Sequence, residues 1–211
     1  NIRFAYGTND NNNALSLNKM LGGSTKNGKN QPLLEGKLKT EKVLILSNEV
    51  MFTPDDIKSL IESPKEITTG FCLGHEHVLA SETMNESYFK NNGTYKLMTT
   101  SDLRDIVDTG EYELAYTALD FVCIKEEVFT KLEYPWFKNN PTKNGIGFYD
   151  HEVSFCKDVA KLDYTIWGDT TVIVGREKLA QIYDTEIFEK VAKKRATEKE
   201  QNSDRLDTID E

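Results

Sequence analysis

The chain has 211 residues, with 26 lysines and arginines against 35 aspartates and glutamates, so its formal net charge at pH 7 is −9. This excess of negative charge disfavours a general nucleic-acid binder and a protein that binds anionic membranes, because both partners require a basic face. No apolar run approaches the roughly 18 residues that a membrane-spanning helix needs. The three cysteines form no Cys-x-x-Cys pair, so we expect a reducing compartment, the cytoplasm.

The first forty residues predict a short strand, a helix and a polar loop. The sequence begins with Asn1 rather than Met and shows neither a signal nor a transit pattern, so we expect it to start inside a longer gene product. Residues 2–6 alternate between apolar and polar and predict a strand. Apolar residues recur at helical spacing from Ala14 to Leu21, and the glycines that follow end this helix.

The next segment predicts a buried strand followed by a helix. The continuous apolar run Val43–Leu46 is typical of a strand that is buried on both faces. Thr53-Pro54-Asp55-Asp56 predicts a helix start, because it combines a capping hydroxyl, a proline and two carboxylates at the positive end of the helix dipole. Residues 47–52 would then lie at the carboxyl end of a central strand, where α/β sheets usually bind ligands.

The remaining chain alternates between strands and helices. The patterns predict strands over residues 66–72, 93–99 and 113–124, helices over 101–110, 125–132 and 148–162, and two final strands, 164–167 and 171–174, joined by a turn at Gly168-Asp169. This alternation predicts an α/β fold with a mixed, mostly parallel sheet flanked by helices. We expect one domain over residues 1–183, followed over residues 184–211 by a charged helix and a disordered tail.

Several segments, in order, resemble one enzyme family. Leu46–Asp55 followed by Ile67–Phe71 is similar to the metal-binding strand end, helix and next strand of GT-A-type glycosyltransferases, particularly those encoded by phages and large viruses. Phe121–Phe129 with Tyr134–Phe137 resembles their acceptor-side segment, and residues 151–156 and 174–178 resemble their last helix and strand. The resemblance implies a GT-A-like sheet that binds a nucleotide-sugar with Mn²⁺ or Mg²⁺. The family's usual first strand-helix unit is missing.

The resemblance also implies the site residues that would bind the cofactor and metal. Ser47-Asn48-Glu49 stands where the family has Asp-x-Asp, so Ser47 and Asn48 become candidate cofactor contacts and Glu49 the candidate metal ligand, because hard cations prefer carboxylate oxygens. The alternative for Glu49 is a solvated loop carboxylate. Arg176 stands at the position of a metal-binding histidine. A guanidinium cannot bind a cation, so Arg176 would either clamp a diphosphate or pair with a carboxylate.

Four further positions complete the candidate site. His151-Glu152 replaces a Glu-Asp pair, which makes Glu152 the candidate general base and His151 a second titrating group, with a structural role as the alternative for each. Asp120 ends the triplet that replaces a Gly-x-Gly and is a third candidate catalytic residue. Asn18 keeps half of an Arg-Asn pair in the early helix and is a candidate cofactor contact.

These departures from the family pattern leave two functions open. The first is a structural or binding module with weakened or lost catalysis, in a virion or bound to a protein partner or a second copy. The alternative is an active glycosyltransferase that moves a sugar from a nucleotide-sugar to a hydroxyl acceptor, either with a cation held by Glu49 and Glu152 or with Arg176 in place of the metal.

Overall fold

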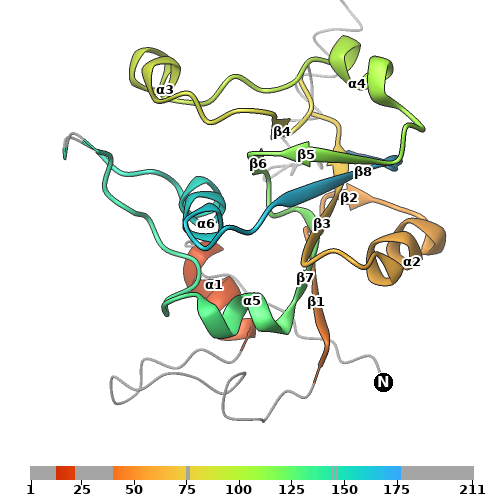
Figure 1. The fold of residues 1–211 in the computed structure, drawn as a ribbon, viewed down its shortest axis with the longest axis horizontal. Coiled ribbons are helices and arrows are strands. Elements are labelled where there is room, and N and C mark those ends of the chain that lie inside the picture. Colours follow the sequence, from red (N-terminus) through yellow and green to blue (C-terminus); the bar gives the residue numbers. More distant parts are fainter. Residues whose placement is uncertain (1–12, 22–39, 75–76, 144, 146, 177–211) are drawn as a thin grey trace, which may run out of the picture. The chain divides into compact units, whose positions relative to one another are not determined.

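A six-stranded sheet forms the centre of the structure, which is a computed structural model that describes residues 13–21, 40–74, 77–143, 145 and 147–176 (Figure 1). All of these residues belong to one compact unit, Asn1–Glu177. The strands of this sheet are β1 (Lys42–Leu46), β2 (Val50–Met51), β3 (Ile67–Cys72), β5 (Glu111–Leu114), β7 (Phe121–Lys125) and β8 (Ile166–Arg176). Their order is β1-β7-β3-β8-β2, and β5 also pairs with β8.

The sheet is mixed, as predicted, but the prediction that it is mostly parallel is wrong. Within the described chain β3 and β8 pair in parallel, whereas β1 with β7, β3 with β7, β2 with β8 and β5 with β8 are antiparallel. The apolar run at β1 suggested a central strand. In the described chain β1 instead pairs with β7 alone, and Leu46 at its end is 40% exposed. An apolar run therefore indicated a strand correctly but not its place in the sheet.

Helices cover both faces of this sheet, with α2 (Pro54–Glu62) on one face and α1 (Asn13–Met20), α5 (Glu126–Lys131) and α6 (His151–Ala160) on the other (Figure 1). The strands alternate accordingly. In β7, Phe121 and Cys123 pack with Leu60 of α2, whereas Val122 and Ile124 belong to the larger core with Phe129 and Phe155. Burial on both faces explains why β3 is buried at every position.

Two capping boxes begin helices in the described chain. At α2 the Thr53 hydroxyl accepts from the Asp56 backbone N–H, and the Asp56 carboxylate accepts from the Thr53 backbone N–H, as the sequence predicts. The same arrangement begins α4 (Thr100–Ile106), but there the cap is Thr99 rather than Ser101. Each box satisfies donors that the first helical turn would otherwise leave unpaired.

Three of the sequence-based element predictions need correction. Residues 93–99 form no strand; they follow α3 (Glu86–Asn92), and Gly93 ends that helix with a left-handed φ of 73°. The predicted strand over 113–124 is divided among β5, β6 (Tyr116–Thr117) and β7, and β6 pairs with β4 (Ala80–Ser81) in a separate two-stranded sheet.

The third correction concerns Gly168, which was expected in a hairpin turn. β8 runs through this position without a turn. A Cβ on Gly168 would lie 2.5 Å from the Phe71 ring, so the strand needs glycine here for close packing rather than for a change of direction. A glycine in a strand pattern therefore has two possible causes, and the packing partner, 97 positions away in the sequence, decides between them.

Glu86 joins α3 to α6 through a partly buried polar network. Lys157 of α6 forms an ion pair with Glu86, which also accepts hydrogen bonds from Tyr95 at 2.9 Å and from Tyr149 at 2.6 Å. Burial opposes ionisation, but the hydrogen bonds from Lys157 and the two tyrosines lower the pKa of Glu86 to about 2. The network thus anchors the helix whose first turn carries His151 and Glu152.

Some predictions fall on other parts of the chain. The strand over residues 2–6, the charged helix, the tail and the boundary after residue 183 lie outside the described residues. Among the helices of the described residues, none has the length and apolar character to cross a bilayer.

Candidate functional site

Four segments bring the predicted charged residues into one cluster. Glu49 lies in the turn between β1 and β2, Asp120 directly precedes β7, Glu152 lies in the first turn of α6, and Arg176 ends β8. The sequence resemblance placed these residues in one site, and the electrostatic and hydrogen-bond contacts below link them. We refer to these four residues, with Asp150 and His151, as the carboxylate cluster.

Arg176 connects two of the carboxylates. Its Nη2 donates to Glu49 Oε2 at 2.6 Å, and its Nη1 lies 3.4 Å from Asp120 Oδ2. The Arg176 side chain is 30% exposed and the Asp120 side chain 15% exposed. The guanidinium therefore bridges two carboxylates from separate segments in a partly screened environment, where a bidentate partner is better satisfied than a single exposed pair.

Backbone pairing explains how these side chains meet. The antiparallel register of β2 and β8 places Val50 opposite Arg176, so the preceding residue, Glu49, lies beside the guanidinium. The backbone N–H of Ser47 donates to the Asp120 carbonyl at 2.8 Å, which ties the β1–β2 turn to the segment before β7. The bridge therefore follows from strand register and turn geometry.

Ser47 and Asn48 take different positions from Glu49. The Ser47 hydroxyl accepts from the Glu49 backbone N–H at 3.3 Å, and its carbonyl accepts from Val50, so Ser47 shapes the turn. Asn48 is exposed. Of the predicted Ser47-Asn48-Glu49 triplet, Glu49 is the residue whose side chain reaches Arg176.

Glu152 is held between two donors from the segment before β7. Its carboxylate accepts from the Tyr116 hydroxyl at 2.9 Å and from the Leu119 backbone N–H at 3.2 Å. Burial raises its pKa to about 7; the Tyr116 hydrogen bond opposes this rise, and the negative charge of Asp120 adds to it. Tyr116 was not identified from the sequence, because a tyrosine in a strand pattern carries no signal of a buried carboxyl partner.

The neighbouring groups titrate under the same influences. Burial raises the pKa of Asp120, Arg176 partly offsets this, and Glu49 reinforces it. Burial lowers the pKa of His151, against the opposing effect of Asp150 and Asp120, so the imidazole is mainly neutral at pH 7. Asp150 also caps α6 by accepting from the Val153 N–H at 2.8 Å. Both candidate catalytic groups of α6 thus face Asp120.

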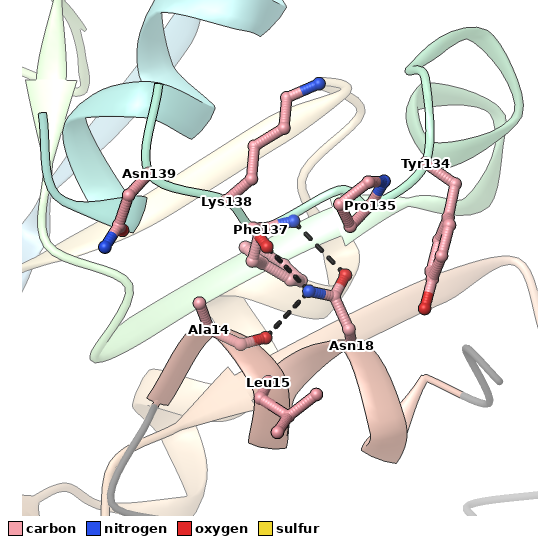
Figure 2. Close-up of a pocket in the computed structure, with 8 residues that line it drawn as sticks. All are labelled: Ala14, Leu15, Asn18, Tyr134, Pro135, Phe137, Lys138 and Asn139. Carbon is pink, nitrogen blue, oxygen red and sulfur yellow. Dashed lines mark hydrogen bonds between the residues drawn. The ribbon is translucent and has the colours of Figure 1, made fainter. Parts of the chain in front are cut away.

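Asn18 has a structural position instead (Figure 2). Its Nδ2 donates to the Ala14 carbonyl at 2.8 Å and to the Phe137 carbonyl at 2.6 Å, and its Oδ1 accepts from the Phe137 N–H at 3.2 Å. These bonds use both amide hydrogens of a side chain that is 4% exposed. Asn18 holds the Tyr134–Phe137 segment against α1, where a pocket of about 400 Å³ opens. The predicted cofactor contact has no free N–H to offer.

The described residues do not fit a resident divalent cation at this place. The two carboxylates that would hold it are occupied by a guanidinium, which offers donors and no lone pair. Nowhere in the described ranges do three or more histidine, cysteine, aspartate or glutamate side chains form a group suited to a metal ion. What the cluster can do is hold a positive charge and present carboxylate acceptors to hydroxyl or amine hydrogens.

Comparisons with known proteins gave one structural likeness. No family model and no curated protein matches the sequence. The solved structure of the viral protein A197 from STIV aligns with a TM-score of 0.49 and 12% sequence identity, over 83% of this chain and 82% of that chain. A likeness of this degree does not assign a function.

The titration of Glu152 predicts a pH-dependent stability. Its pKa is about 7 in the folded chain against 4.5 for a solvated glutamate, so the folded chain keeps a proton that the unfolded chain releases, and stability falls as pH rises through this window. Glu152→Gln removes the effect. We expect the free energy of unfolding of the wild type to fall more steeply than that of the variant, by up to about 1.4 kcal/mol per pH unit.

Denaturant unfolding from about pH 5 to about pH 8 measures this difference. Glu62→Gln, at an exposed position on α2, is the matched control and should follow the wild type. Parallel curves for the wild type and Glu152→Gln would show that Glu152 titrates as a solvated group.

Proposed function

We propose that this chain is a glycosyltransferase-like binding or structural module of the GT-A type in which metal-dependent transfer is weakened or lost. The observation that carries the proposal is the guanidinium of Arg176 between the carboxylates of Glu49 and Asp120. The sequence resemblance supplies the scaffold, and the ion-paired cluster supplies the reason for altered chemistry. Its partner would then be another protein or a second copy of the chain.

The physical argument concerns competition for the same oxygens. A nucleotide-sugar donor normally needs a hard cation to neutralise its diphosphate leaving group. Here a cation would have to displace Arg176 from Glu49 and Asp120 and leave a partly buried guanidinium beside it. Both the loss of the ion pairs and the approach of two positive charges oppose that exchange. The cluster is therefore better suited to keep its own internal cation.

Titration with UDP-glucose and with GDP-mannose, each with and without Mn²⁺, tests this proposal by calorimetry. We expect Mn²⁺ to give no increase in affinity for either donor with the wild-type chain. Arg176→Ala frees Glu49 and Asp120, so Mn²⁺ binding should increase in that variant and fall again in Arg176→Ala combined with Glu49→Gln. Clear Mn²⁺-dependent binding of a donor to the wild type would contradict the proposal.

An active glycosyltransferase is the second candidate, and Glu152 favours it. A carboxyl whose pKa is raised to about 7 by burial can accept a proton from an acceptor hydroxyl near neutral pH. Asp120 lies close enough to raise that pKa further. In this case Arg176 would have to release a carboxylate and stabilise the leaving diphosphate in place of a metal.

Release of free sugar from UDP-glucose or GDP-mannose tests the second candidate. We expect Glu152→Gln to reduce any such turnover by about 100-fold or more, since it removes the proton acceptor and keeps a similar shape. Glu62→Gln on α2 should leave turnover unchanged. No turnover by the wild type with any donor and hydroxyl acceptor tried would exclude this candidate.

A further inference from the structure

The charges of the carboxylate cluster do not balance. Four carboxyl groups, Glu49, Asp120, Asp150 and Glu152, face one guanidinium, and the pKa of His151 is lowered mainly by burial. Among the described residues, Arg176 and His151 are the basic groups that act on the titration of Asp120, and no lysine does. The cluster is therefore net negative at pH 7 even with Arg176 in place.

This balance opposes an anionic ligand. To clamp a phosphate, Arg176 would have to leave Glu49 at 2.6 Å and Asp120 at 3.4 Å, and the released carboxylates would then face the phosphate oxygens. Like charges at such separations repel strongly when partly removed from water. A ligand that brings hydroxyl hydrogens avoids this cost, because ionised carboxylates are strong acceptors for O–H donors.

Exposed apolar side chains adjoin the same cluster. Phe52 follows Glu49 by three positions, is 42% exposed, and stacks on Phe121 with ring centroids 5.6 Å apart. Met51 is 55% exposed, and its Cε would lie 3.2 Å from a Cβ on Gly175, beside Arg176. An aromatic face next to carboxylate acceptors suits a molecule that has one apolar face and a rim of hydroxyl groups.

We infer that the ligand class of this site is an uncharged, hydroxyl-rich molecule, a neutral glycan, rather than a nucleotide diphosphate. The glycan's ring would stack on Phe52, and its hydroxyl groups would donate to Glu49 and Asp120. This inference rests on the proposed function, because it names what the binding module binds. Arg176 keeps its ion pairs in the complex and holds the two acceptor carboxylates in place.

Calorimetric titration of the full chain with maltotriose, cellotriose and chitotriose, beside UDP-glucose, tests the inference. We expect at least one neutral trisaccharide to bind, with affinity reduced about tenfold by Phe52→Ala and by Asp120→Asn, and retained by Phe52→Tyr, which keeps the aromatic face. Tyr88→Ala, which removes an exposed aromatic on α3, should leave binding unchanged. Thermal melting of each variant separates loss of binding from loss of folding.

The outcomes separate this inference from the proposed function. Binding of UDP-glucose without Mn²⁺, or no binding of any neutral trisaccharide, would overturn the glycan ligand and leave a binding or structural module standing. Glycan binding that Phe52→Ala and Asp120→Asn do not weaken would place the ligand elsewhere and overturn the inference as well. UDP-glucose binding that requires Mn²⁺ would overturn both.

Discussion

The ion-paired guanidinium of Arg176 is the interaction on which the site depends. It reaches Glu49 from the β1–β2 turn and Asp120 from the segment before β7, so three separate parts of the chain share one positive charge. The β2–β8 register fixes two of these partners, and the hydrogen bond from Ser47 to the Asp120 carbonyl fixes the third. The same contact that organises the cluster also occupies the oxygens that a cation would need.

Burial gives the other half of the cluster its chemistry. Glu152 begins α6 and accepts from Tyr116 and Leu119, so its charge is supported by two donors but is removed from water. The result is a carboxyl that titrates at about 7, close to an aspartate whose own pKa is raised. A negative cluster with one internal cation presents acceptors rather than a phosphate-binding surface, which is why its charge, and not its scaffold, suggests the ligand class.

Local signals in the sequence predicted local structure well. The capping box at Thr53, the helix that contains Ala14 and the strand at Ile67 depend on neighbours within a few positions, and the structure has all three. Long-range packing decided the rest. The continuity of β8 at Gly168 depends on Phe71, the edge position of β1 on its partners, and the clamp made by Asn18 on the Phe137 backbone. The grouping of Glu49, Asp120 and Arg176 came from family resemblance, since no spacing rule joins residues so far apart.

A double-mutant cycle between Arg176 and Asp120 tests most directly whether the guanidinium holds the cluster together. The free energy of unfolding would be measured for the wild type, Arg176→Met, Asp120→Asn and the double variant, with Glu62→Gln replacing Asp120→Asn in a control cycle. If the guanidinium stabilises Asp120, the first cycle gives a coupling energy of about 0.5 kcal/mol or more and the control cycle gives a value near zero. Additive effects in both cycles would contradict the central role of Arg176.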